Sequence, residues 1–174
     1  MRRTLITSAL AVLVFTVLLG VAYPLAITGV SQLAFGVKAD GVPTLLARDV
    51  KRDARYFQPR PSQTGYDAHA TAFSNRGPNQ RSAAVFYREQ IAAYKRLNDG
   101  AQPPIDAVTT SGSGLDPLIS AANAAIQARR VARVRGLPLT RVQALVRAAT
   151  DGRSLGLLGE PGVNTTKLNE ALDR

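Results

Sequence analysis

Apolar residues fill the first part of the chain almost without interruption. Between Thr4 and Val37 there is no Asp, Glu, Lys, Arg or His, and Leu5 to Val21 consists almost wholly of Leu, Val, Ala, Ile and Phe. A helix rises about 1.5 Å per residue, so about 20 such residues cross the apolar core of a bilayer. The pattern predicts one transmembrane helix over residues 5–27, with Pro24 marking or kinking its exit end.

The charges beside this segment predict its orientation. Arg2 and Arg3 precede it, whereas Lys38 and Asp40 cancel after it. Positive residues favour the cytoplasmic side of a membrane. We therefore expect residues 1–4 in the cytoplasm, a juxtamembrane linker over 28–55 and an extracytoplasmic domain over 56–174, in a single-pass protein of the cell (inner or plasma) membrane.

A cleaved signal peptide is the alternative for the same segment. Gly20-Val21-Ala22 offers small residues to a signal peptidase, and cleavage there would release a secreted binding protein. The apolar run is longer than an ordinary signal-peptide core and continues through Leu25, Ile27, Val30 and Leu33. This length favours an uncleaved anchor.

Beyond the linker, irregular and periodic stretches alternate. Residues 56–78 are dense in Pro, Gly, Ser, Asn and aromatic residues without a helical or strand period, which predicts an irregular loop. Apolar residues three and four apart predict a helix over 81–98, and a second helix opens with a capping box at Thr140 and continues to Ala149. A last helix should be capped by Asn164 or Thr165.

The most strongly specified stretch runs from Thr109 to Leu137. Small hydroxyls and glycines from Thr110 to Gly114 predict a tight turn, and Asp116-Pro117 predicts the start of a helix, with the carboxylate as N-cap. Arginines crowd the end of that helix, and Gly136 suits a left-handed C-cap. The helix should therefore stop at about Arg135.

Short strands complete the predicted fold. Residues 44–47 and 105–109 have the length and side chains of strands, and the leucines of 155–158 suit a strand or turn. The fold class is thus α+β: a single N-terminal transmembrane helix followed by one mixed α+β extracytoplasmic domain, with helices dominating the C-terminal half.

Composition removes several kinds of site. The chain has no Cys, and His69 is its only histidine, so a disulfide framework, a thiolate metal site and a multi-histidine site are excluded, and we expect no bound metal. Lys and Arg total 22 against 12 Asp and Glu. This excess favours anionic partners or is simply a solvated basic surface.

The candidate sites for phosphate binding and for a serine nucleophile lack residues that these functions require. The Gly-rich turn has no G-x-x-x-x-G-K-[ST] pattern for phosphate, and Ser111 or Ser113 would need His69 as base without a G-x-S-x-G elbow. Residues 127–149 have the layout of a basic helix-turn-helix, so a membrane-anchored nucleic-acid-binding protein is the alternative function. An exported domain would not meet DNA, and we expect neither a catalytic site nor a nucleic-acid partner.

Several motifs occur in an order typical of one family. They include Tyr23-Pro24-Leu25 at the end of the anchor, Tyr56-Phe57 and Arg60-Pro61-Ser62 in the irregular loop, the stretch from Thr109 to Pro117, and Gly156-Leu157-Leu158-Gly159-Glu160-Pro161 followed by Val163-Asn164. By these motifs the chain resembles the C subunits of the Kdp potassium-transporting ATPases, bacterial complexes for high-affinity potassium uptake. Leu45-Leu46-Ala47-Arg48 is all that stands for a longer Gly-Ser-x-Leu-Ile-Gly-Gln type stretch usual in that family.

The resemblance implies a non-catalytic accessory subunit that assembles or stabilises the complex and acts as a catalytic chaperone raising the ATP affinity of the ATPase subunit. The implied partners are a channel-like potassium-translocating subunit, a P-type ATPase subunit, a small single-span subunit and membrane lipid, with ATP met through the ATPase subunit. ATP is cytoplasmic and the domain is predicted to be outside, so stabilising the complex is the physically simpler role.

The same resemblance marks a set of residues as structural or assembly positions, none of them a catalytic residue or metal ligand. They are Arg60, Pro61, Ser62, Ser111, Gly112, Ser113, Gly114, Asp116, Pro117, Gln127, Arg130, Gly159, Glu160, Pro161, Asn164 and Asn169. We expect the turn at Gly112–Gly114 to fix the geometry of the domain against the transporter.

Overall fold

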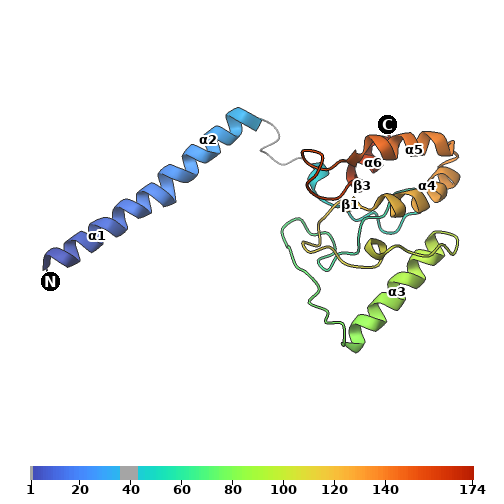
Figure 1. The fold of residues 1–174 in the computed structure, drawn as a ribbon, viewed down its shortest axis with the longest axis horizontal. Helices are drawn as coiled ribbons and strands as arrows, with labels where there is room; N and C mark the ends of the chain where they lie inside the picture. The colour runs from blue at the N-terminus through green and yellow to red at the C-terminus, as the bar shows by residue number, and fades with distance from the viewer. Residues whose placement is uncertain (1, 36–42) are drawn as a thin grey trace. The chain divides into compact units, whose positions relative to one another are not determined.

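The computed structural model describes residues 2–35 and 43–174 (Figure 1). The chain divides into two compact units, Met1–Val42 and Pro43–Arg174. The first unit contains a helix, and the second contains the irregular loops, a small sheet and four α-helices.

The helix of the first unit runs from Arg2 to Phe35 through one widened turn. It comprises α1 (Arg2–Val17), a π-helical turn η1 (Leu18–Ala22) and α2 (Tyr23–Phe35). Pro24 has no N–H, and its ring would press on the carbonyl four residues earlier, so a proline is accommodated by such a local change in hydrogen bonding. In the widened turn the N–H of Tyr23 donates to the carbonyl of Leu18.

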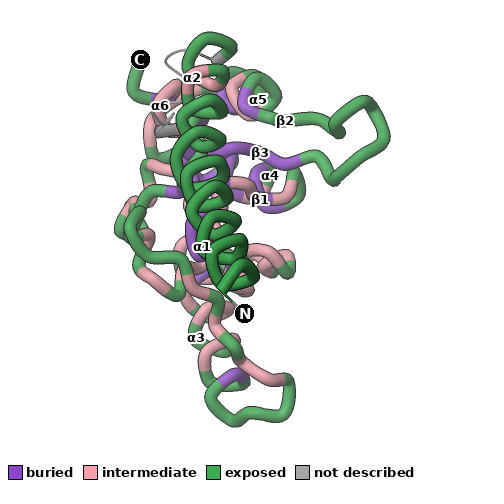
Figure 2. The backbone as a smooth tube through the Cα atoms, turned by 90° about the vertical axis from the view of Figure 1, so that its left-hand side faces the viewer, coloured by how far each residue is buried: buried purple, intermediate pink, exposed green. Residues whose placement is uncertain are grey.

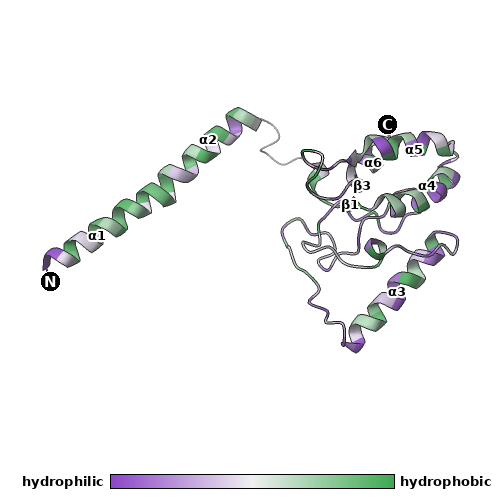
Figure 3. Ribbon diagram, viewed as in Figure 1, coloured by the Kyte–Doolittle hydropathy of each residue, from purple (hydrophilic) through white to green (hydrophobic). Residues whose placement is uncertain are grey.

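This helix is long and apolar enough to cross a membrane, because Arg2–Ala34 forms 33 helical residues and no side chain of its most apolar window is buried. Figure 3 shows hydrophobic residues along most of its length. The helix does not end at Pro24 or at residue 27 but continues to Phe35. Part of the predicted linker, 28–35, is thus helical, and residues 43–55 belong to the folded second unit.

The second unit alternates short helical turns, helices and very short strands. Its elements are η3 (Pro43–Leu45), α3 (Arg81–Leu97), η4 (Ile105–Ala107), β1 (Leu118–Ile119), α4 (Ala121–Arg135), α5 (Leu139–Ala148), β2 (Thr150–Asp151), β3 (Gly162–Asn164) and α6 (Thr165–Leu172). The three strands form an antiparallel sheet in the order β1-β3-β2. Ile119 and Thr150 both pair with Val163, so β3 is the central strand.

The core lies between the sheet and the C-terminal helices. The helix α5 packs against α4 and α6, and β3 contacts α4 and α6. In Figure 2 β3 and much of α4 are buried, while α3 stands apart from this layer. The core residues are Phe57, Ile119, Ala124, Ala128, Val131, Ala132, Val142, Ala149, Val163, Leu168 and Leu172.

Several predicted elements are confirmed. The helix predicted over 81–98 is α3, and the last helix α6 is capped by Asn164, whose Oδ1 accepts from the Lys167 N–H at 3.0 Å. Gly136 ends α4 in the left-handed region with φ 64°. Residues 56–78 contain no helix or strand.

Other predicted elements are wrong. Residues 43–45 and 105–107 form single 3₁₀ turns, so neither predicted strand exists at 44–47 or 105–109. Pro138, without a side-chain cap, precedes α5, and Thr140 lies inside that helix.

The predicted helix start at Asp116 is also wrong. Asp116 Oδ1 accepts from the Leu118 N–H at 2.9 Å, Leu118–Ile119 pairs with β3, and the helix begins at Ala121 with Ser120 as its cap. Leu118 and Ile119 therefore belong to the sheet, and the helix begins only after them.

Candidate functional site

Two side-chain amides hold the start of the irregular loop in an extended conformation. Gln127 Oε1 accepts from the Gln58 N–H at 2.7 Å, and Gln127 Nε2 donates to the Gln58 carbonyl at 3.1 Å. Asn169 does the same for Phe57, accepting from its N–H at 2.8 Å and donating to its carbonyl at 2.9 Å. A carboxamide presents one donor and one acceptor side by side, so each replaces the partner that a neighbouring strand would supply.

Gln127 and Asn169 together form a clamp on Gln58 and Phe57. Arg130 adds to this clamp from the interior of the unit. It is 1% exposed, and its guanidinium donates to the carbonyls of Ala54 and Tyr56 and to the side-chain oxygens of Asn98 and Gln127. All four acceptors are neutral. Burial lowers the pKa of Arg130 to about 10 because the charged form is desolvated. The buried charge is compensated by hydrogen bonds rather than by a carboxylate.

The same face of α4 carries a second polar contact, to α3. Asn123 Oδ1 accepts from the Tyr94 hydroxyl at 2.9 Å and from Gln127 Nε2 at 2.9 Å, while Asn123 Nδ2 donates to Asp106 at 3.0 Å. Asp106 also accepts from the N–H and hydroxyl of Ser120. Burial raises the pKa of Tyr94 to about 12. Asn123, Gln127 and Arg130 thus form one network that ties α3 and the loop to α4.

The glycine-rich turn packs against the irregular loop. Gly114 has φ +75°, and a Cβ there would lie 3.1 Å from Thr64 Oγ1 and 3.2 Å from both the Ala72 carbonyl and Ser62 Oγ. The Ala72 N–H donates to the Ser113 carbonyl at 3.3 Å. Only glycine fits this close approach with this backbone conformation.

Arg60 ties the two sides of this contact together. Its guanidinium donates to the Thr110 carbonyl at 3.0 Å and lies 3.9 Å from the Asp116 carboxylate. Ser62 Oγ accepts from the N–H groups of Thr64 and Tyr66, and the Tyr66 hydroxyl donates to the Arg60 carbonyl at 2.8 Å. The marked residues of the loop and turn therefore form one interlocked structure.

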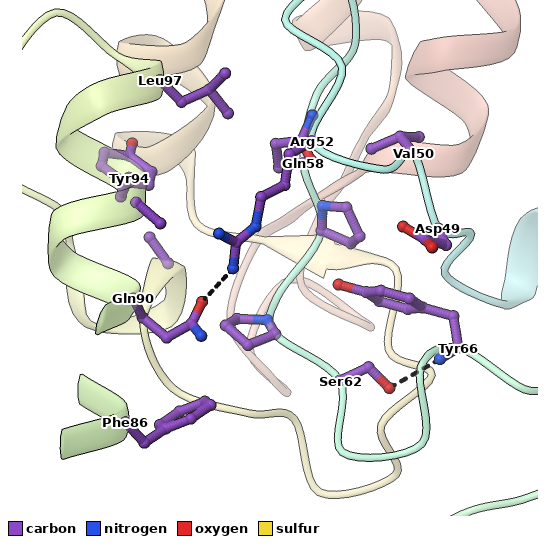
Figure 4. A pocket seen from close by; sticks show the side chains of 14 residues that line it. Asp49, Val50, Arg52, Gln58, Ser62, Tyr66, Phe86, Gln90, Tyr94 and Leu97 are labelled. Atoms are coloured by element: carbon purple, nitrogen blue, oxygen red, sulfur yellow. Dashed lines mark hydrogen bonds between the residues drawn. The ribbon is translucent and has the colours of Figure 1, made fainter. Parts of the chain in front are cut away.

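A cavity of about 210 Å³ lies between this loop and α3 (Figure 4). Arg52 crosses it and donates to Gln90 at 3.2 Å, while Phe86 and Tyr94 face it from α3 and Tyr66 from the loop. Its lining combines a few polar groups with apolar walls. No cluster of reactive groups converges on it among the residues that the structure describes.

The marked residues form three groups in space, with Asn164 apart from them. Gln127, Arg130 and Asn169 form the clamp, and the residues from Arg60 to Ser62 and from Ser111 to Pro117 form the loop-turn contact. Gly159, Glu160 and Pro161 lie elsewhere, in the connection from β2 to β3, where Glu160 pairs with Arg153 at 3.0 Å. Asn164 donates to the Thr44 carbonyl at 2.8 Å and ties the start of the unit to β3.

The geometry lends no support to hydrolysis or phosphate binding. His69 is exposed, and within the described residues no hydrogen bond joins it to Ser111 or Ser113. The turn leads into β1 and not directly into a helix, and Asp116 places a carboxylate beside it. Across residues 2–35 and 43–174, no group of three His, Asp or Glu could hold a metal ion.

The helix-turn-helix alternative has no support. Arg130 is buried, Arg133 pairs with Asp99, and Arg135 bonds Asp173 and the carbonyls of Arg55 and Leu172. These three arginines are used for contacts within the second unit.

The partners of the clamp were not predicted from the sequence. Asn98, Asp106 and Asn123 were not marked, although Asn98 and Asn123 are almost fully buried. One signal was available: Asn123, Gln127 and Arg130 are spaced four and three apart, on the helix face that also carries Ala124, Ala128 and Val131. Polar residues recurring on an apolar face predict a buried network.

Comparison with known proteins identifies the family. The family model "K+-transporting ATPase, c chain" (KdpC) matches residues 5–174. The chain is 46% identical over 190 aligned residues to the potassium-transporting ATPase KdpC subunit of Mycobacterium tuberculosis (strain ATCC 25618 / H37Rv), with all of both chains covered. It is 47% identical over 171 residues to the subunit of the same name from Caulobacter vibrioides (strain NA1000 / CB15N), with 91% of this chain and 87% of the relative covered. The chain therefore belongs to the KdpC family, the accessory c chains of K+-transporting ATPases.

Proposed function

We propose that this chain is a single-pass membrane subunit that stabilises its potassium-transporting ATPase from the extracytoplasmic side. The observation that carries the proposal is the pairing of a 33-residue apolar helix with a folded unit whose polar groups are used for internal contacts. The helix is about 50 Å long at 1.5 Å per residue, which exceeds the bilayer core of about 30 Å. Part of it would therefore project beyond the lipid or tilt.

The orientation rests on charge. Arg2 and Arg3 precede the apolar segment, and positive residues favour the cytoplasmic side. The second unit, Pro43–Arg174, would then lie outside, near the face from which potassium enters. The proposed partners are the channel-like subunit, the P-type ATPase subunit and the small single-span subunit of the same complex.

Cysteine labelling tests the orientation, since the chain has no Cys of its own. Gln143→Cys places an exposed thiol on α5, and Thr4→Cys places one before the apolar segment. In intact cells a membrane-impermeant maleimide should label Gln143→Cys and not Thr4→Cys, and permeabilisation should make both reactive. Labelling in the reverse pattern would overturn the proposed topology.

ATP is used by the complex, and the glycine-rich turn of this chain is not built to hold it. The turn has a carboxylate beside it, no lysine and no helix behind it. The turn therefore offers ATP no phosphate-binding site. The subunit would act on ATP use only through the stability or conformation of its partners.

Two measurements separate an effect on the stability of the complex from an effect on its affinity for ATP. Membranes with and without this chain are compared for the amount of assembled complex and for the KM for ATP per assembled complex. If the subunit stabilises the complex, its absence lowers the amount of complex and leaves the KM unchanged. A normal amount of complex with a raised KM would instead support the role of catalytic chaperone.

A further inference from the structure

An exposed apolar hairpin tip stands out from the second unit. The connection between β2 and β3 carries Leu155, Leu157 and Leu158, which are 88%, 70% and 57% exposed. Figure 2 shows this connection as an exposed loop extending beyond the two strands. Three neighbouring leucines in water are unfavourable unless a partner covers them.

The tip has a defined shape. The Ser154 N–H donates to the Leu158 carbonyl at 2.8 Å, and the Leu158 N–H donates to the Ser154 carbonyl at 2.9 Å. Leu155 adopts φ 54° and Gly156 φ 78°, so the chain reverses within one tight turn. The Arg153–Glu160 ion pair, at 3.0 Å, closes the base. A leucine in the left-handed region is uncommon, so this turn carries local backbone strain.

The hairpin is attached to the start of the folded unit. Its second strand, β3, ends in Asn164, which donates to the Thr44 carbonyl at 2.8 Å, and Thr166 donates to the Leu46 carbonyl at 2.7 Å. In Figure 1 the hairpin and η3 lie at the same end of this unit. The hairpin thus lies beside the first residues of the second unit, Thr44 and Leu46.

We propose that the tip of this hairpin, Leu155, Leu157 and Leu158, docks into an apolar pocket with an acidic rim on a membrane-embedded subunit of the same ATPase. This inference rests on the proposed function. Residues 43–174 carry 19 Lys and Arg against 11 Asp and Glu, and Arg141 and Arg147, on the helix that leads into β2, are exposed and form no ion pair with the described residues. This charge complements an acidic rim.

The chemistry of the tip fits a protein better than lipid. Segments that lie in a bilayer interface combine Trp, Phe or Leu on the apolar face with free Lys or Arg on the polar face. The tip has no aromatic residue, its one arginine is paired, and the Glu160 side chain is 82% exposed. A fixed turn also suits a shaped pocket, because a preorganised segment loses less entropy on binding.

Co-purification tests the inference. The full chain is expressed with the other subunits, and the complex is isolated through a tag on the ATPase subunit. The variant Leu155→Ser/Leu157→Ser/Leu158→Ser should reduce recovery of this chain at least tenfold without changing its thermal unfolding midpoint. The matched control Phe73→Ser/Ile105→Ser/Val134→Ser removes three other exposed apolar side chains and should leave recovery unchanged.

The outcomes separate the two proposals. If the unmodified chain does not co-purify, the proposed function itself fails. If it co-purifies and the hairpin variant does so equally, only the hairpin inference is overturned. Loss of recovery in the control as well as in the hairpin variant would also overturn it, because the effect would not be specific to the tip.

A fluorescent probe distinguishes protein from lipid. A polarity-sensitive dye on Ser154→Cys, beside the tip, is followed in nanodiscs of phosphatidylethanolamine and phosphatidylglycerol. The inference expects a blue shift only when the other subunits are present. A blue shift with this chain alone would show that lipid covers the leucines and would overturn the inference.

Discussion

Gly112 and Gly114 differ sharply although they are two residues apart. Gly114 has a positive φ and a Cβ position 3.1–3.2 Å from Thr64, Ala72 and Ser62, whereas a Cβ on Gly112 meets nothing within 4 Å. Of these two glycines, only Gly114 is required by the close approach of the turn to the loop.

Gly114→Ala should destabilise the second unit by about 2 kcal/mol, since it adds backbone strain to a tight contact. Gly112→Ala, the matched control, should stay within about 0.5 kcal/mol of the unmodified chain. Urea unfolding of the full chain in detergent, followed by tyrosine fluorescence, measures both. Equal stability of the two variants would show that the loop can move away from the turn.

Tyr94 makes the stability of the second unit depend on pH in alkaline solution. Burial raises the pKa of its hydroxyl to about 12 from the ordinary value of 10.0. A raised pKa in the folded state means that this group contributes stability fully below pH 10 and loses it as the pH rises toward 12. Tyr66 follows the same direction, and Arg130, whose pKa burial lowers to about 10, acts in the opposite direction.

The variant Tyr94→Phe isolates this effect. The difference in unfolding free energy between the unmodified chain and the variant should shrink by up to about 2 kcal/mol between pH 10 and pH 12. Loss of the bond to Asn123 adds a constant offset that does not depend on pH. A difference that stays constant over this range would contradict the assigned burial of Tyr94.

At the scale of elements, α4 and α6 each use one amide to hold one residue of the loop. Gln127 bonds both backbone groups of Gln58, and Asn169 bonds both of Phe57. Gln127→Ala should therefore speed amide hydrogen exchange at Gln58 by roughly tenfold while Phe57 stays protected, an effect of about 1.4 kcal/mol.

Asn169→Ala should show the reverse pattern, with faster exchange at Phe57 and protection kept at Gln58. Gln143→Ala, on the exposed side of α5, serves as control and should change neither amide. If either clamp variant exposes both amides together, the loop opens as one unit and the two residues do not act independently.

The elements also show what the sequence can predict. Gly136 and Asn164 carry local signals, a left-handed C-cap and an N-cap, and both were correct. The start of α4 was wrong because Asp116-Pro117 is a good local cap, whereas the choice of Ser120 depends on β3, more than 40 residues away. Strands of two or three residues are too short for alternation to be visible.

At the scale of the whole molecule, the buried network was the hardest part to foresee. Arg130 was marked by resemblance, and as one of the arginines near the end of the helix it was expected to complement the helix dipole. Its acceptors come from residues 54, 56, 98 and 127, which only the folded chain brings together. The apolar helix needs no tertiary context, so its existence was predictable, although the widened turn that carries it through Pro24 was not.

The division after Val42 leads to a last prediction. Because the core lies entirely within Pro43–Arg174, that segment expressed alone should fold and unfold cooperatively. Its net charge of +8, from 19 Lys and Arg against 11 Asp and Glu, should help to keep it soluble without detergent. The full chain should sediment with membranes and need detergent for release, as expected for a membrane-spanning helix. Hydrogen exchange at Phe57 and Gln58 should match between fragment and full chain. Faster exchange in the fragment would show that the apolar helix also stabilises the folded unit.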